Sequence, residues 1–233
     1  MWKPLCAVVA VAAMVVAVTF FFRVQHIAVT GVSRYSEEEV LDASGLELGG
    51  NLYFINKFEV KKALFRQLPY LEEIRINRKL PDTLLIDVRE CTADAAAQST
   101  EGWWMLSDNG KLLAQVESPE PGCVLLKGAV LTEPAVGAQA EFGEAYSYRA
   151  GVALALLREA EQRGMRKSIA EVDLSDDTAL CMAYLNRFTV RFPWTADIGY
   201  KLETLDTVVN YLENNETGRI DLMTEGKASF IPQ

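Results

Sequence analysis

The chain has 233 residues and a formal net charge of −9 at pH 7. Phosphate binding requires clustered lysine and arginine, so this acidic balance excludes nucleic-acid binding and gives no attraction to anionic lipid headgroups. The chain has a single histidine, His26, and no C-x-x-C pair, which excludes a zinc site and Cys/His catalysis. The length allows one large or two small domains, each with its own core.

An uncharged apolar run, LCAVVAVAAMVVAVTFFF, covers residues 5–22. As a helix it would extend roughly 27 Å, enough to cross the hydrocarbon core of a bilayer. The alternative is a cleaved secretory signal, but such signals have a shorter apolar core and end at small residues. This run ends in three phenylalanines and Arg23. We therefore predict a cytoplasmic stub over residues 1–4, an uncleaved membrane anchor over residues 5–22 and an extracytoplasmic body, the topology of a single-pass type II protein.

Residues 23–91 predict a small domain that begins with a strand and two helices. The alternating segment 24–31 ends at a glycine, as a strand before a turn does. An S-x-x-E capping box at Ser36 begins the first helix, and Gly45 ends it. Asn56 begins the second helix, which Pro69 prevents from continuing. The apolar residues assigned to this second helix are Phe58, Leu64, Phe65 and Leu68.

Two strands complete this domain. The segments LEEIRIN and TLLIDVRE flank a turn at Pro81 and Asp82. The resulting order is β-α-α-β-β, with both helices expected on one face of a three-stranded sheet.

Residues 92–233 predict a larger, mainly antiparallel β domain with two helices, which makes the whole chain α+β. The polar segment 92–100 fits either an inter-domain junction or an irregular strand. A hairpin is expected around the N-G turn at Asn109 and Gly110. Helical periodicity covers residues 146–163 and 198–212. The remaining expected strands are residues 123–127, three successive segments between 169 and 192, and two terminal segments, RIDLM and KASFI.

Candidate catalytic residues are few. Asp173, Asp176 and Asp177 could form a carboxylate site, but their segment has the composition of a hairpin turn. Trp103 and Trp104 could form a glycan platform, although alternation along a strand directs one of them into the core. The sequence has no G-x-S-x-G, G-x-G-x-x-G or G-K-[ST] motif. We therefore predict that the protein is not an enzyme and has no cofactor.

Three cysteines follow the apolar run, namely Cys91, Cys123 and Cys181. Disulfides form outside the cytoplasm, so one bridge is an alternative for them. Their odd number and wide spacing favour unpaired, buried thiols.

The last expected strand is followed by only two residues, Pro232 and Gln233. An unpaired strand edge is a template for a partner's strand. The alternative is an edge made unreceptive by Lys227 and Pro232, and the sequence leaves both interpretations open.

The order of these parts resembles the FtsQ/DivIB family of bacterial cell-division proteins. In the first domain, the matching stretches resemble the family's POTRA domain and cover residues 22–31, 36–45, 51–54 and 68–90. In the second domain, the matching stretches cover residues 104–116, 171–175, 199–212 and 218–222.

The resemblance implies a non-enzymatic scaffold at the division septum in the cell membrane. Its partners would be small bitopic coiled-coil proteins of the FtsB/DivIC and FtsL types, together with other divisome components. The partner's segment would add to the terminal strands at Met223, Thr224, Gly226, Ala228 and Phe230. Two other hypotheses remain: a membrane-tethered POTRA protein that chaperones exported polypeptides, and a glycan binder or hydrolase directed at the cell wall.

Overall fold

A computed structural model describes residues 21–232 of the chain. The chain divides into two compact units, Met1–Cys91 and Thr92–Gln233. The predicted stub, and all of the predicted anchor except its last two residues, lie outside the described residues. Between residues 21 and 232, no helix combines the length and the apolar character needed to cross a bilayer.

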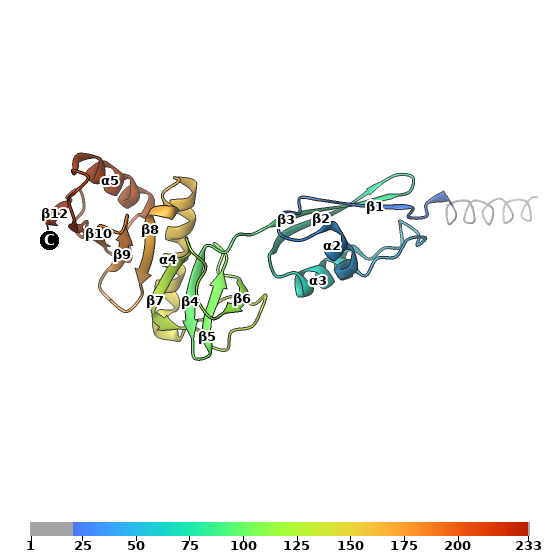
Figure 1. Ribbon diagram of the computed structural model, residues 1–233, viewed down its shortest axis with the longest axis horizontal. Coiled ribbons are helices and arrows are strands. Elements are labelled where there is room, and N and C mark those ends of the chain that lie inside the picture. Colours follow the sequence, from blue (N-terminus) through green and yellow to red (C-terminus); the bar gives the residue numbers. More distant parts are fainter. Residues whose placement is uncertain (1–20, 233) are drawn as a thin grey trace, which may run out of the picture. The chain divides into compact units, whose positions relative to one another are not determined.

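The described part of the first unit has the predicted β-α-α-β-β order (Figure 1). Its elements are β1 (His26–Thr30), α2 (Glu37–Ser44), α3 (Lys57–Gln67), β2 (Leu71–Lys79) and β3 (Thr83–Glu90). The sheet order is β1-β3-β2, in which β3 pairs in parallel with β1 and antiparallel with β2.

Both predicted helix starts in this unit are confirmed. The Ser36 side chain accepts a hydrogen bond from the Glu39 amide, and the Glu39 carboxylate accepts one from the Ser36 amide. Gly45 ends α2 in the left-handed conformation that glycine tolerates. The Asn56 side chain caps α3 through the Phe58 amide at 3.1 Å.

The core of the first unit lies between the two helices and the sheet. Val60 and Leu64 form the buried stripe of α3, one helical turn apart. Phe58, which we assigned to the same apolar set, is instead 70% exposed. It lies off that stripe, two residues before Val60, so most of its ring is left in solvent.

The second unit combines one large sheet with two long helices. Its strands are β4 (Ala95–Ser99), β5 (Gly102–Leu106), β6 (Leu112–Val116), β7 (Val124–Val130), β8 (Ile169–Asp173), β9 (Leu180–Tyr184), β10 (Phe188–Phe192), β11 (Gly218–Asp221) and β12 (Ser229–Pro232). Its helices are α4 (Glu144–Gln162), the short η1 (Arg166–Ser168) and α5 (Ile198–Tyr211).

Within the described residues, the strand order of this sheet is β12-β11-β10-β9-β8-β7-β4-β5-β6. The β10–β11, β7–β8 and β4–β7 pairs are parallel, and the other five pairs are antiparallel. The sheet is therefore mainly antiparallel, as the sequence predicts.

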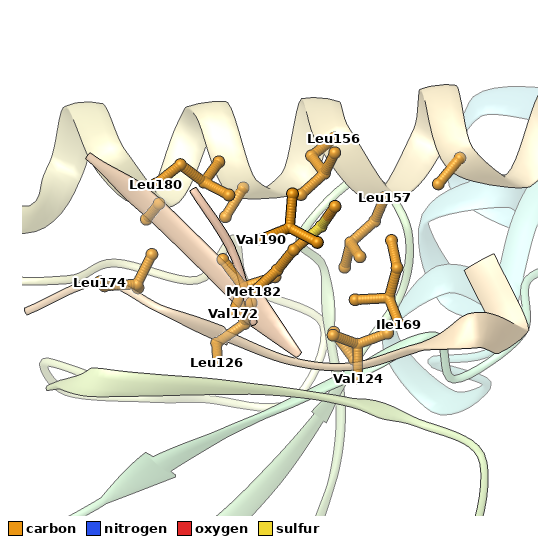
Figure 2. Packing of buried hydrophobic residues seen from close by; sticks show 14 of the residues in the cluster. Val124, Leu126, Leu156, Leu157, Ile169, Val172, Leu174, Leu180, Met182 and Val190 are labelled. Carbon is orange, nitrogen blue, oxygen red and sulfur yellow. The ribbon is translucent and has the colours of Figure 1, made fainter. Parts of the chain in front are cut away.

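The core of the second unit lies between the helices and one face of the sheet. Figure 2 shows Leu156 and Leu157 of α4 directed at the strand residues Met182 and Val190. Leu202 and Leu205 of α5 belong to the same cluster. Residues on the opposite face of β10, such as Thr189, are exposed, so this part of the sheet is covered on one side.

The segment predicted as a junction or an irregular strand forms β4, inside the sheet between β5 and β7. Ala95, Ala96 and Ala97 are all fully buried. Alanine gives little β-propensity signal, so only its neighbours in the sheet make this segment a strand.

Candidate functional site

The strand β12 lies at one end of the larger sheet. It pairs antiparallel with β11, with Phe230 opposite Ile220 and Ile231 opposite Arg219. No other strand of residues 21–232 pairs with its outer side. An outermost strand carries backbone N–H and C=O groups that can receive a further strand. We therefore take this outer side of β12 as the candidate site and call it the open edge.

Phe230 attaches β12 to the core. Its side chain packs against the buried cluster of the second unit, and its ring lies edge-to-face with that of Phe188, with 6.1 Å between the ring centroids. The next residue, Ile231, points to the other face and is 43% exposed. The strand is thus held on one face and accessible on the other.

Gly218 allows β12 to approach β11 closely. Its φ of +154° is one that side chains rarely adopt, and a Cβ atom there would lie 2.2 Å from the Ile231 carbonyl oxygen. Only a residue without a side chain fits this backbone and this spacing. The pairing of the last two strands therefore depends on this glycine.

A buried lysine fixes the chain where it leaves β11. Lys201 of α5 is only 6% exposed, and its Nζ donates a hydrogen bond to the Leu222 carbonyl at 2.7 Å. The Leu222 amide donates to the Arg191 carbonyl on β10 at 2.8 Å. A buried cation needs such a partner, so the two bonds hold the start of the β11–β12 connection.

The structure separates the five predicted partner-binding residues into two groups. Met223, Thr224, Gly226 and Ala228 lie on the connection between β11 and β12, and only Phe230 lies on a strand. The Met223 amide donates to the Asp221 carboxylate at 3.0 Å, which shapes the start of the connection. The predicted set does not include Ile231, although alternation along KASFI places this residue opposite in direction to Phe230.

The other end of the same sheet is covered by its own chain at the start of β6. The Leu112 amide donates to the Ala138 carbonyl, and the Gly137 amide donates to the Leu112 carbonyl, both at 2.8 Å. Lys111 and Gln139 form an additional bridge. The segment 137–139 therefore occupies the outer side of the sheet at the start of β6.

The aspartate cluster forms a turn, as predicted. Asp176 accepts hydrogen bonds from the Thr178 hydroxyl at 2.6 Å and the Thr178 amide at 2.8 Å, and Arg191 lies 3.0 Å away. These contacts, led by the Thr178 hydroxyl, lower the pKa of Asp176 to about 2. Among residues 21–232, no group of three or more candidate ligands could hold a metal ion.

The structure also shows how far the two candidate tryptophans and the three cysteines are buried. Trp104 is 6% exposed and belongs to the core, while Trp103 is half-buried. Cys123 and Cys181 are unpaired thiols, as expected, but they are only partly buried, whereas Cys91 is buried. Burial raises the pKa of the Cys123 thiol, which donates to the Ala93 carbonyl at 3.0 Å.

Comparison with known proteins gives matches to both units. Residues 22–90 match a family model described as "POTRA domain, FtsQ-type". Residues 95–223 match one described as "Cell division protein FtsQ/DivIB, C-terminal". The second match covers more than half of the chain and ends before β12.

Similar individual proteins carry the same names. The cell division protein DivIB of Clostridium acetobutylicum is 24% identical over 219 residues, which are 91% of this chain and 84% of that protein. The cell division protein FtsQ of Novosphingobium aromaticivorans is 30% identical over 125 residues, 52% of this chain and 38% of that protein. The cell division protein FtsQ of Corynebacterium glutamicum is 27% identical over 107 residues, 46% of this chain and 47% of that protein.

Proposed function

The chain belongs to the FtsQ/DivIB family of cell-division proteins, and we propose that it is a non-enzymatic scaffold of the division septum. Residues 5–22 would anchor it in the cell membrane as a single-pass protein with its two domains outside the cytoplasm. The domains would link other membrane-anchored division proteins. The proposed direct partners are small bitopic coiled-coil proteins of the FtsB/DivIC and FtsL types.

The observation that carries this proposal is the open edge. A partner segment that pairs with β12 would satisfy backbone groups on both chains, and the exposed Ile231 side chain would contact its residues. The other end of the sheet has the segment 137–139 beside it. A partner strand would therefore join this sheet at β12, with the connection from Met223 to Ala228 beside it.

The test is co-purification of the full chain with its co-expressed bitopic partners. The variant Ile231→Lys adds a charge beside the open edge, a device by which natural edges resist pairing. We expect it to weaken binding by about tenfold or more, which corresponds to a loss of about 1–2 kcal/mol of binding free energy at one interface position. The matched control is Val130→Lys, because Val130 is 48% exposed and lies on β7, inside the sheet.

Unchanged binding by Ile231→Lys, with a folded protein, would contradict the edge-strand mechanism. Equal losses in both variants would indicate a general charge effect. Binding to varied unfolded polypeptides, with no septal position of a fluorescent fusion, would favour the chaperone hypothesis.

A further inference from the structure

One end of the first unit exposes large apolar side chains. Leu48, Tyr53, Phe54 and Leu80 are 64%, 47%, 81% and 55% exposed. We call these four residues the apolar tip. Exposed apolar residues that are scattered singly need no explanation, but a group of them indicates a surface that something covers.

Three separate segments meet at this end of the unit. The Val24 amide donates to the Gly50 carbonyl, and the Gln25 amide donates to the Asp82 carbonyl, both at 2.8 Å. The segment before β1, the connection between α2 and α3, and the tip of the β2–β3 hairpin therefore lie together. Figure 1 shows the hairpin tip and this connection at the end of the unit where β1 begins.

The backbone around Phe54 and the ring of Tyr53 are held by contacts within the unit. Arg78 donates from Nε to the Leu52 carbonyl at 2.7 Å, and Leu52 is fully buried. The Tyr53 ring lies edge-to-face with that of Phe22, with 5.1 Å between centroids. The fold thus fixes the backbone on both sides of Phe54 while leaving its ring in solvent.

The position of the apolar tip in the chain indicates what covers it. Hydrogen bonding of the Leu52 amide to the Phe22 carbonyl at 2.8 Å joins the tip to the last residue of the apolar run. Aromatic side chains concentrate where a membrane meets water, because the ring is apolar and tolerates polar surroundings at its edge. Charges of both signs flank the tip, namely Arg23, Glu47, Arg78, Lys79 and Asp82.

We infer that the apolar tip lies in the headgroup region of the lipid bilayer, so that the first unit is in contact with the membrane as well as tethered to it. This inference rests on the proposed anchor at residues 5–22. Contact with lipid removes Phe54 and Leu48 from water, which favours the bound position. It would also restrict how the first unit tilts relative to the membrane.

Photo-crosslinking of the full chain in its native membrane tests this contact. A benzophenone amino acid replaces Phe54 in one variant and Met14, inside the apolar run, in a second. A third variant carries it at Phe58, which is aromatic, 70% exposed and in the same unit. Phe58 lies beside Arg75, Ile76 and Asn77, roughly 10–17 Å along β2 from Leu80.

We expect lipid adducts at Met14 and Phe54 and none above background at Phe58. Lipid adducts at Met14 with only protein adducts, self-adducts or none at Phe54 would overturn the inference and leave the anchor standing. Equal lipid adducts at Phe54 and Phe58 would also overturn it, because the contact would not be specific to the tip. Absence of lipid adducts at Met14 would contradict the anchor and, with it, this inference.

Discussion

The two ends of the larger sheet differ in what lies beside their outermost strands. At the β6 end, the segment 137–139 hydrogen-bonds to Leu112, whose side chain is almost fully buried. At the β12 end, three of the four strand residues are exposed, and Phe230 alone packs on the core. An edge can be protected by its own chain or left for another chain, and in the described residues the start of β6 is protected while no strand pairs with the outer side of β12.

Substitutions at the two ends are therefore expected to affect different properties, folding stability at one end and partner binding at the other. The β6 end contributes buried apolar area, so substitutions there are expected to cost folding free energy. The β12 end contributes little area, so its substitutions are expected to affect binding more than folding.

Truncation of Leu112 compares the two ends directly. Leu112→Ala leaves a cavity at the covered end and should lower the free energy of unfolding by about 3 kcal/mol. Ile231→Ala, at the open edge, should cost about 0.5 kcal/mol. Urea unfolding monitored by tryptophan fluorescence measures both, and equal costs would show that β12 is as well packed as β6.

Gly218→Ala tests how firmly β12 is attached. The new Cβ would meet the Ile231 carbonyl oxygen at 2.2 Å, so β12 should detach and the unfolding free energy should fall by about 2 kcal/mol. Hydrogen exchange should show loss of protection confined to residues 218–232. Gly143→Ala is the control, because its Cβ would meet no atom within 4 Å.

Phe230→Ala removes the one side chain that attaches β12 to the core. Because the ring is only partly buried, we expect a loss of about 1.5 kcal/mol in the same unfolding measurement. Phe58→Ala, at a 70% exposed ring, should have almost no effect. A negligible loss for Phe230→Ala would mean that backbone pairing alone holds the strand.

Asp176 lies in the turn between β8 and β9, in the same sheet as the open edge, and should make the stability of the fold depend on pH in acid. Its pKa is about 2 in the folded protein against an ordinary 3.8, so the stabilisation is complete above about pH 4 and is lost as the pH falls toward 2. Asp176→Asn should cost about 1 kcal/mol at pH 7, after allowance for solvent screening. This difference from the unsubstituted protein should shrink below pH 4.

Thermal unfolding between pH 2 and pH 7 checks this dependence, with Asp177→Asn as a control of equal charge change. An unchanged acid dependence in Asp176→Asn would show that other carboxylates dominate it.

Local signals in the sequence determined most of the elements. The caps at Ser36, Asn56 and Gly45 act within one helical turn, so their residues alone predicted where α2 begins and ends and where α3 begins. The aspartate turn at Asp176 was equally local. Such interactions involve neighbours in the chain, which a sequence displays directly.

Other features were decided only by contacts between distant segments. The alanines of β4 are a strand because β5 and β7 pair with them, and Phe58 is exposed because α3 turns another stripe toward the sheet. The order of parts predicted a terminal strand, but the strand pairing placed it at the end of the sheet and turned Ile231 outward. Sheet order and the cover over β6 depend on backbone groups, which are alike in every residue and therefore leave little trace in the sequence.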